Sequence, residues 1–239
     1  MTERTKENLS LTPRLQTIAD RVPKGAGFAD IGTDHGHLPL WLLETDVLQT
    51  AIACDLREGP LEHARENARF HGLSERVCFR LAAGLDAVRA EECDTISIAG
   101  MGGETIAGIL QAAPWTAKGA HKLLLQPMTM LPQLRQWLWA NGYQIFEETV
   151  CREGKRFYVI LTVQGGGVPQ EKPLSACYVS PELLRSKGAS DYLQALLRRE
   201  TNALHGMQTS AKTAPAAIRE QEEIVRQIQI AWEMIICHS

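Results

Sequence analysis

The segment DIGTDHG, residues 30–36, brings two carboxylates, two glycines and a histidine into one short stretch. It follows an apolar run that begins at Phe28 and precedes an apolar segment with helical spacing. Gly32 and Gly36 allow a sharp turn and a close approach of the backbone to a ligand. The helix that follows would present free N–H groups at the same place. This arrangement is typical of a nucleotide site at the end of a strand.

The spacing of the glycines narrows the class of ligand. It is G-x-x-x-G and not the G-x-G-x-x-G of dinucleotide-binding proteins, and Asp34 takes the place of the middle glycine. A carboxylate there repels a pyrophosphate, which disfavours NAD, FAD and a nicotinamide oxidoreductase. A ligand with a positively charged amino group suits the turn better, and S-adenosylmethionine carries one. A helix-capping turn with solvated carboxylates is the alternative.

A further carboxylate favours a nucleoside ligand. Asp55 ends the apolar run IACD and follows Asp30 by 25 positions. An acidic side chain at the end of a second strand can accept both hydroxyl groups of a ribose, which a neutral side chain cannot match. The sequence therefore predicts that the turn and Asp55 hold one nucleoside cofactor between them.

The histidines raise the question of a metal ion. Asp34, His35 and His37 are close in sequence, but a zinc site takes three or four ligands and no further His or Cys cluster supplies the rest. The six cysteines are scattered, without a C-x-x-C pair. We expect no metal site and cysteines that stay reduced, as in a cytoplasmic protein.

The segment IAGMGGETI, residues 98–106, has no polar side chain before Glu104. Its glycines, at 100, 102 and 103, must act through backbone groups or by leaving room for a flat base. Close packing of a strand against a helix explains them as well. Met101 can flank a base, although a methionine is also a common core residue.

Apolar strand-like runs alternate with helical patterns from about residue 10 to residue 165, which predicts a mostly parallel sheet covered on both faces. A tight turn at residues 152–155 joins two further strands into an antiparallel edge hairpin. The expected strands are 27–31, 50–55, 76–82, 95–100 and 121–127, with the hairpin over 143–164. The expected helices are 15–22, 37–44, 59–72, 102–113 and 130–142.

The glycines and prolines of residues 165–173 break this pattern. They predict a Rossmann-like domain over residues 1–166 and a second domain over residues 167–239. Ser180 with Pro181, and Thr213 with Pro215, are typical helix starts. Apolar residues recur after them at three- and four-residue spacing, which predicts a coiled-coil-like helical hairpin.

The composition is that of a globular protein, with 44% hydrophobic and 22% charged residues and a net charge of -3. The chain has no run of about 18 apolar residues, so we expect no membrane span. Its N-terminal segment, MTERTKENLSLTPRLQ, lacks the apolar core of a signal peptide, which agrees with a cytoplasmic location. The charge does not by itself indicate a nucleic-acid partner.

Four segments together resemble the TrmK family, the bacterial tRNA (adenine-22, N1)-methyltransferases. They are LTPRLQTIADRVPKGAGFADIGTDHGHLP, DLREGPLEHARENARFHGL, IAGMGG and LLLQP. The resemblance extends from about Leu11 to about Val163. It implies a class I S-adenosylmethionine-dependent methyltransferase fold with a C-terminal coiled-coil domain. It also implies methyl transfer to N1 of adenosine 22 in the D-arm of tRNA.

The resemblance implies site residues by position. The methionine end of the cofactor would be lined by Asp30, Gly32, Asp34 and His35. Asp55 would hold the ribose, with Leu56 beside the adenine. The implied cofactor contacts are Asp30, Gly32, Asp34, His35, Gly36, Asp55, Leu56, Ala83, Gly84, Gly100 and Met101. The implied substrate contacts are Arg14, Met101, Gly102, Gln126 and Pro127. A salt bridge on the first helix is the alternative for Arg14.

Two positions depart from the family pattern. Ala83 stands where the family has an Asp that contacts the adenine amino group of the cofactor, and Met128 stands where it has an Asn. Neither change removes Asp30 or Asp55, so the expected activity stays. The alternatives are a class I methyltransferase for another substrate and a catalytically weakened homologue that still binds cofactor or RNA.

The implied reaction is a direct displacement in which adenine N1 attacks the methyl group. N1 carries a lone pair at neutral pH, so no strong general base is required. Asp34 and His35 are the catalytic candidates: Asp34 can accept a hydrogen bond from the adenine amino group, and His35 can orient Asp34. N1 lies on the base-pairing edge, so the base must be unpaired or flipped out.

The role of the C-terminal helices stays open. Residues 185–239 carry seven Lys or Arg and six Asp or Glu, so their charge is about neutral. A grip on tRNA, a structural hairpin and a dimer contact are all compatible with this composition. We expect a monomer or a weak homodimer.

Overall fold

The computed structural model describes residues 9–210 and 212–237. Residues 1–8 lie outside the described residues. They are part of the N-terminal segment in which we expected no signal peptide. So do the outer limits of both predicted domains. Within the described ranges, no helix is long and apolar enough to cross a membrane.

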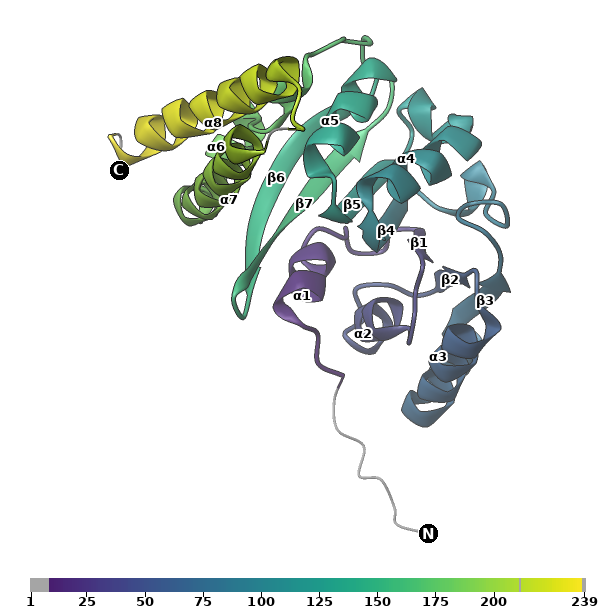
Figure 1. Cartoon of the computed structure of the whole chain (residues 1–239). Helices are drawn as coiled ribbons and strands as arrows, with labels where there is room; N and C mark the ends of the chain where they lie inside the picture. Colours follow the sequence, from purple (N-terminus) through teal and green to yellow (C-terminus); the bar gives the residue numbers. More distant parts are fainter. Residues whose placement is uncertain (1–8, 211, 238–239) are drawn as a thin grey trace.

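One sheet of seven strands forms the centre of the molecule (Figure 1). The strands are β1 (Phe28–Ile31), β2 (Ala51–Asp55), β3 (Val77–Leu81), β4 (Thr95–Gly102), β5 (Lys122–Thr129), β6 (Gln144–Glu153) and β7 (Arg156–Gln164). Their order across the sheet is β3-β2-β1-β4-β5-β7-β6. The first five are parallel, and β7 pairs antiparallel with both β5 and β6. This confirms the predicted mostly parallel sheet with an antiparallel hairpin at its edge.

Five helices cover the two faces of the sheet. They are α1 (Pro13–Ala19), α2 (His37–Glu44), α3 (Glu58–His71), α4 (Gly103–Ala112) and α5 (Leu131–Ala140). Short 3-10 turns lie at Ser74–Arg76, Ala90–Glu92, Pro114–Lys118 and Leu174–Cys177. Alternate residues of a strand point to opposite faces, so Leu124 packs with α1, α2 and α3. Its neighbours Leu123 and Leu125 pack with α4 and α5.

Several predicted boundaries were wrong by two or three residues, among them those of the first helix and of the fourth strand. The first helix starts at Pro13 and ends at Ala19, because the Thr12 hydroxyl caps it by accepting a hydrogen bond from Leu15 N. β4 continues to Gly102, and α4 starts at Gly103. The pairing of β4 with β5 shifts register twice over this extension, an irregularity that simple periodicity does not reveal.

The C-terminal segment forms three helices: α6 (Pro181–Leu184), α7 (Ala189–Thr209) and α8 (Pro215–Ile236). Ser180 caps α6 as predicted, since its hydroxyl accepts a hydrogen bond from Leu183 N. A separate α6 was not predicted; Gly188, with φ of 85°, precedes the new helix α7. Pro215 begins α8 as predicted, but Ala214 and not Thr213 is its cap residue. α7 and α8 pack on each other as a helical hairpin (Figure 1).

The helical hairpin shares one hydrophobic core with the sheet. Leu193 of α7 and Ile228 of α8 are fully buried in the same cluster as Ile96 of β4 and Leu125 of β5. α6 packs on the edge strand β6, and α8 packs on the 3-10 turn Leu174–Cys177, which also contacts α5. The predicted domain boundary after residue 166 stays a prediction, and the two parts are joined by continuous packing.

A buried ion pair stabilises the contact between the sheet and the C-terminal helices. The Arg135 guanidinium of α5 is fully buried and contacts both carboxylate oxygens of Glu148 on β6. Arg135 also donates hydrogen bonds of 2.9 and 3.0 Å to the carbonyl oxygens of Cys177 and Tyr178. The Ser180 hydroxyl donates to Glu148 Oε1 at 2.7 Å, so the cap of α6 is tied to the same carboxylate.

Candidate active site

A cleft of 690 Å³ opens at the carboxyl ends of β1, β2 and β4. This is the edge at which open α/β sheets bind ligands. All the predicted cofactor contacts except His35 and Gly36 line it. Of the predicted substrate contacts, Arg14 and Met101 line it, whereas Gly102, Gln126 and Pro127 do not.

The first turn is fixed to the neighbouring strand by its backbone. The N–H groups of Gly32 and Thr33 donate hydrogen bonds of 2.8 and 2.9 Å to the carbonyl oxygen of Cys54. Gly32 has a φ of +74°, and a Cβ on it would lie 2.2 Å from the Met101 methyl group. The positive φ favours glycine at this position, and the side chain of Met101, near the end of β4, fills the space above the turn.

Asp55 is oriented by two backbone groups. Its side chain is buried, and its carboxylate accepts hydrogen bonds from Asp34 N at 3.2 Å and from Arg57 N at 2.9 Å. An ionised carboxylate offers about four acceptor positions. Lone pairs therefore stay free at the cleft for the hydroxyl groups of a ribose.

Asp30 is a buried carboxylate with an altered acidity. Burial raises the pKa of Asp30 to about 6, against the smaller lowering effect of the Thr33 and Ser97 hydroxyls. The negative charge of Asp55 raises this pKa further, and Arg14 lowers it. A positively charged group in the cleft would offset the cost of ionising Asp30. These residues therefore fit a ligand that has an ammonium group and a ribose, as S-adenosylmethionine has.

Asp34 and His35 take different positions. Asp34 lines the cleft, has a φ of 52° and is largely exposed. The His35 ring stacks on His63 of α3, with centroids 5.1 Å apart, outside the cleft. His35 Nε2 still lies 3.8 Å from Asp34 Oδ1. The ring can therefore influence the Asp34 carboxylate only from the side that faces away from the cleft.

Gly36 and Gly102 have roles in the backbone. Gly36, with φ of +74°, precedes α2, and a Cβ there would lie 3.1 Å from Ala64 of α3. Gly102 takes the cap position before α4. Both position the walls of the cleft without lining it. The described residues also contain no group of three or more His, Cys, Asp or Glu side chains placed to hold a metal ion.

Gln126 lies behind the cleft and connects two of its walls. Its buried Oε1 accepts hydrogen bonds from Arg14 Nη1 at 2.8 Å and from Gly100 N at 3.1 Å. Its Nε2 donates to the carbonyl oxygen of Pro127 at 2.9 Å. Within the described ranges Arg14 forms no ion pair, so the salt bridge considered for it is absent there. The Arg14 guanidinium lies 5.8 Å from the centre of the Tyr158 ring.

The sequence analysis missed several residues in and around the cleft. Thr33 and Ser97 adjust the acidity of Asp30, and Thr12 and Ile109 line the cleft. The polar position of Ser97 in the apolar run TISIAG was a usable signal. Nothing in the local sequence indicated that Thr12 and Ile109 would reach the cleft from α1 and α4.

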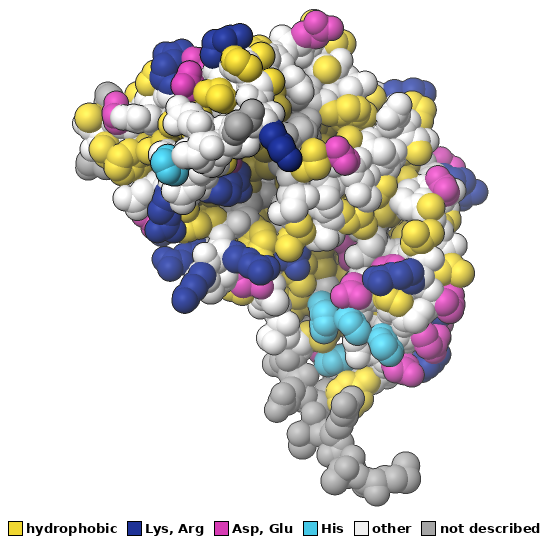
Figure 2. Space-filling view, in the orientation of Figure 1, with side chains coloured by type: hydrophobic (Ala, Val, Ile, Leu, Met, Phe, Trp, Pro, Cys, Tyr) yellow, Lys and Arg dark blue, Asp and Glu magenta, His cyan; other side chains and the backbone are white. Residues whose placement is uncertain are grey.

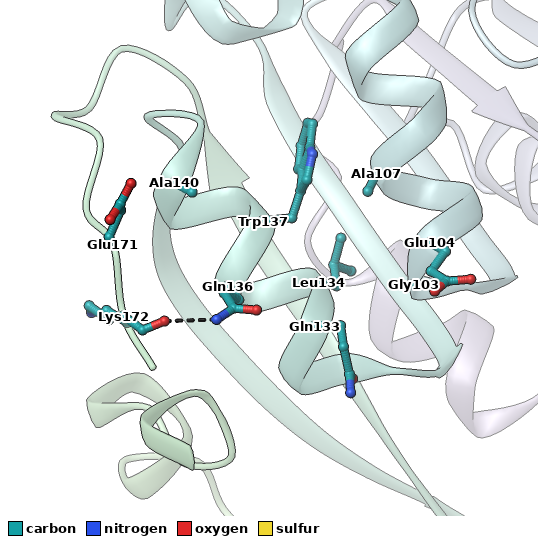
Figure 3. A pocket seen from close by; sticks show the side chains of 10 residues that line it. All are labelled: Gly103, Glu104, Ala107, Gln133, Leu134, Gln136, Trp137, Ala140, Glu171 and Lys172. Carbon is teal, nitrogen blue, oxygen red and sulfur yellow. Dashed lines mark hydrogen bonds between the residues drawn. The ribbon is translucent and has the colours of Figure 1, made fainter. Parts of the chain in front are cut away.

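A second cavity, of 510 Å³, lies between α4, α5 and the segment after β7 (Figure 3). Trp137 and Leu134 supply its apolar wall, and Glu171 and Lys172 lie at its rim. Gln136 Nε2 donates a 2.8 Å hydrogen bond to the Lys172 carbonyl oxygen. None of the predicted site residues lines this cavity.

Comparisons with known proteins agree on a methyltransferase. The model of a methyltransferase domain family matches residues 11–161. The tRNA (adenine(22)-N(1))-methyltransferase of Bacillus subtilis is 36% identical over 158 residues, which are 66% of this chain and 66% of that protein.

Two solved structures extend the likeness to the C-terminal helices. The crystal structure of the B. subtilis tRNA methyltransferase TrmK has a TM-score of 0.82 and 28% identity, and the match covers 94% of this chain and 99% of that one. A proposed tRNA methyltransferase of Streptococcus pneumoniae, in complex with S-adenosyl-L-methionine, has a TM-score of 0.80 and 31% identity. That match covers 93% of this chain and all of the other.

Proposed function

We propose that this chain, which belongs to the TrmK family of methyltransferases, transfers a methyl group from S-adenosylmethionine to N1 of adenosine 22 in tRNA. The observation that carries the proposal is the pair of buried carboxylates, Asp30 and Asp55, at the ends of adjacent parallel strands. Both face one cleft, and their environments suit an ammonium group and a ribose.

Different residues of the cleft would hold different parts of the cofactor. Asp30 would bind the ammonium group, because a cation relieves the cost of its buried charge. Asp55 would accept hydrogen bonds from the ribose, and the exposed Leu56 side chain would cover the adenine. When bound, S-adenosylmethionine supplies a methyl group that is already activated by its sulfonium.

The other residues would place the acceptor base. Gly100 and Met101 lie where the cleft passes from β1 to β4, and Gly100 offers room beside the Arg14 guanidinium. Asp34 would accept a hydrogen bond from the adenine amino group and so stabilise the cationic product. His35 would act as a positioning residue behind Asp34. Such alignment supplies most of what this displacement needs.

The proposal is tested with unmodified tRNA transcripts and labelled S-adenosylmethionine. One transcript carries adenosine at position 22, and a matched transcript carries guanosine there. We expect label on the first transcript alone, recovered as N1-methyladenosine after digestion. The Asp55→Ala variant should bind cofactor weakly and provides the background value.

Two other results would contradict the proposal. Label on both transcripts would mean a different target nucleotide. Cofactor binding without label on either transcript would favour another substrate or a catalytically weakened homologue, the alternatives suggested by Ala83 and Met128. Labelling of fractionated cell RNA and small-molecule pools separates these two cases.

A further inference from the structure

The arginines of this protein fall into two groups. Eleven of the sixteen described arginines form an ion pair with a carboxylate. Within the described part of the chain, the arginines without one are Arg14, Arg152, Arg156, Arg198 and Arg219. Four of these five line the cleft or the cavities next to it. The described arginines without an ion pair are therefore concentrated at one place.

That place is a groove between the β6–β7 hairpin and α7, which we call the hairpin groove. It consists of a cavity of 410 Å³, lined by Arg156, Tyr158 and Tyr192, and a cavity of 480 Å³, lined by Arg152 and Arg198. Phe157 lines both cavities, so they adjoin. Figure 2 shows Lys and Arg side chains gathered around a hollow between the C-terminal helices and the rest of the molecule.

The hairpin groove is strongly positive although the whole chain has a net charge of -3. Its walls carry five cations, since Lys155 and Arg199 add to the three arginines without ion pairs. Asp191 is the acidic side chain among its lining residues. Arg199 is held by Glu200 through a contact of 2.7 Å, so its charge is partly compensated.

Aromatic rings lie among these cations. Phe157 and Tyr192 meet edge to face with centroids 6.3 Å apart, and the Arg152 guanidinium lies 5.6 Å from the Phe157 ring centre. Cations that track a backbone, with aromatic rings on which bases can stack, are the two features of single-stranded nucleic-acid sites. An acidic peptide would use the cations but would leave the rings without a specific role.

The hairpin groove is continuous with the active-site cleft. Met128 lines both the cleft and the first cavity of the groove. Arg14 lines the cleft and contacts the face of Tyr158, which lines the groove. A strand that leaves the cleft beside Met128 therefore enters the groove directly.

We infer that the hairpin groove binds the RNA strand next to the target nucleotide, with Arg152, Arg156 and Arg198 on its phosphates. This inference rests on the proposed function. It assigns RNA contact to the side of α7 that faces the β6–β7 hairpin, and so gives the C-terminal helices a direct part in substrate binding. The sequence left a grip of these helices on tRNA open but could not locate the groove, because its cations come from two segments more than 40 positions apart.

The test compares the double variant Arg156→Gln/Arg198→Gln with Arg219→Gln in the full-length protein. Arg219 is a matched control, because it also lacks an ion pair among the described residues but lies on α8 outside the groove. We expect the double variant to raise the KM for tRNA about tenfold or more at fixed salt and to leave cofactor affinity unchanged. The slope of log affinity against log salt should fall by about 0.7 to 0.9 for each lost phosphate contact. The control should stay within about twofold of the wild type.

Two results would overturn the inference while the proposed function stands. In one, the wild type methylates tRNA and the double variant keeps the wild-type KM and salt slope. In the other, Arg219→Gln loses as much as the double variant, which would mean a general effect of net charge. If the wild type methylates no tRNA, the proposed function fails. Binding of tRNA by the wild type, the double variant and Arg219→Gln then tests the inference about the groove separately. Loss of binding to phosphatidylserine vesicles with unchanged tRNA binding would assign the groove to anionic lipid instead.

Discussion

Arg14 and Gln126 are 112 positions apart in the sequence and are joined by a 2.8 Å hydrogen bond at the edge of the active-site cleft. Gln126 is fully buried and also accepts the N–H of Gly100, so one amide oxygen holds α1 and the end of β4 at a fixed separation. The Arg14 guanidinium is thereby placed beside Gly100, where the acceptor base is proposed to enter.

Removing this amide should impair catalysis more than cofactor binding. We expect Gln126→Leu to lower kcat/KM for tRNA by about 10- to 100-fold, because it releases both Arg14 and the loop at Gly100. Arg14→Ala should lower it as well, and the double variant should be little worse than the worse single variant. Steady-state kinetics of all three test this coupling, with Gln111→Leu on the exposed side of α4 as the control. Additive losses would mean that the two residues act independently.

We expect Asp30 to lower the free energy of unfolding of the cofactor-free protein at neutral pH. The folded chain keeps the Asp30 proton up to a pH of about 6, whereas the unfolded chain releases it near the ordinary Asp pKa of 3.8. Asp30 therefore contributes stability that is fully present below pH 3.8 and is lost as the pH rises through about 6. We expect Asp30→Asn to raise the free energy of unfolding by about 1–3 kcal/mol at pH 7.5.

The same variant should bind S-adenosylmethionine at least about tenfold more weakly, because it loses the charge that would face the ammonium group. Urea unfolding of both proteins between pH 4.5 and 8, followed by calorimetric titration with cofactor, tests the two effects together. The difference in stability should shrink toward acidic pH as the wild-type carboxyl becomes protonated. A variant that loses stability at pH 7.5 and keeps its cofactor affinity would contradict this role of Asp30.

The strands and the first turn of the site could be predicted from sequence because their signals are local. Asp30, Gly32 and Asp55 lie at strand ends, and apolar runs bounded by glycines mark those ends well. Met101 was predicted at the site, but its contact above Gly32 depends on the register shifts between β4 and β5 around Met101. Such a contact has no periodicity to reveal it.

Two predicted site residues lie outside the cleft lining because of long-range packing. His35 was predicted at the cofactor, but its ring stacks on His63, which α3 brings alongside. Gln126 was predicted as a substrate contact and is instead buried behind the cleft with Arg14 as its partner. In both cases the side chain follows a neighbour that is distant in sequence, and spacing within one segment carries no information on it.

Ala83 offers a test by gain of affinity. It is exposed at the edge of the cleft, and by resemblance to the family an Asp at this position contacts the cofactor's adenine amino group. We expect Ala83→Asp to bind S-adenosylmethionine about 3- to 10-fold more tightly, since one added hydrogen bond contributes about 1 kcal/mol. Calorimetric titration measures this, with Ala120→Asp as an exposed control outside the cleft. Unchanged or weaker binding would mean that Ala83 does not lie beside the adenine.

The buried pair of Arg135 and Glu148 should be among the most sensitive positions for stability. Removal of one partner leaves an uncompensated buried charge, which costs about 3–5 kcal/mol. We therefore expect Arg135→Met to lower the free energy of unfolding by this amount in urea, and Glu148→Gln to lower it by less. Arg226→Met, which breaks an exposed pair with Glu223 on α8, should have no measurable effect.

A double variant separates the electrostatic contribution of the Arg135–Glu148 pair from its role in attaching α6. Arg135→Met combined with Glu148→Leu removes both charges, so it should recover part of the loss. Recovery should stay incomplete, because the Cys177 and Tyr178 carbonyls and the Ser180 hydroxyl still lose their partners, and with them the attachment of α6. Limited proteolysis after residue 173 should then be faster in the double variant than in the wild type. Full recovery of stability with unchanged proteolysis would show that the C-terminal helices are held by hydrophobic packing alone.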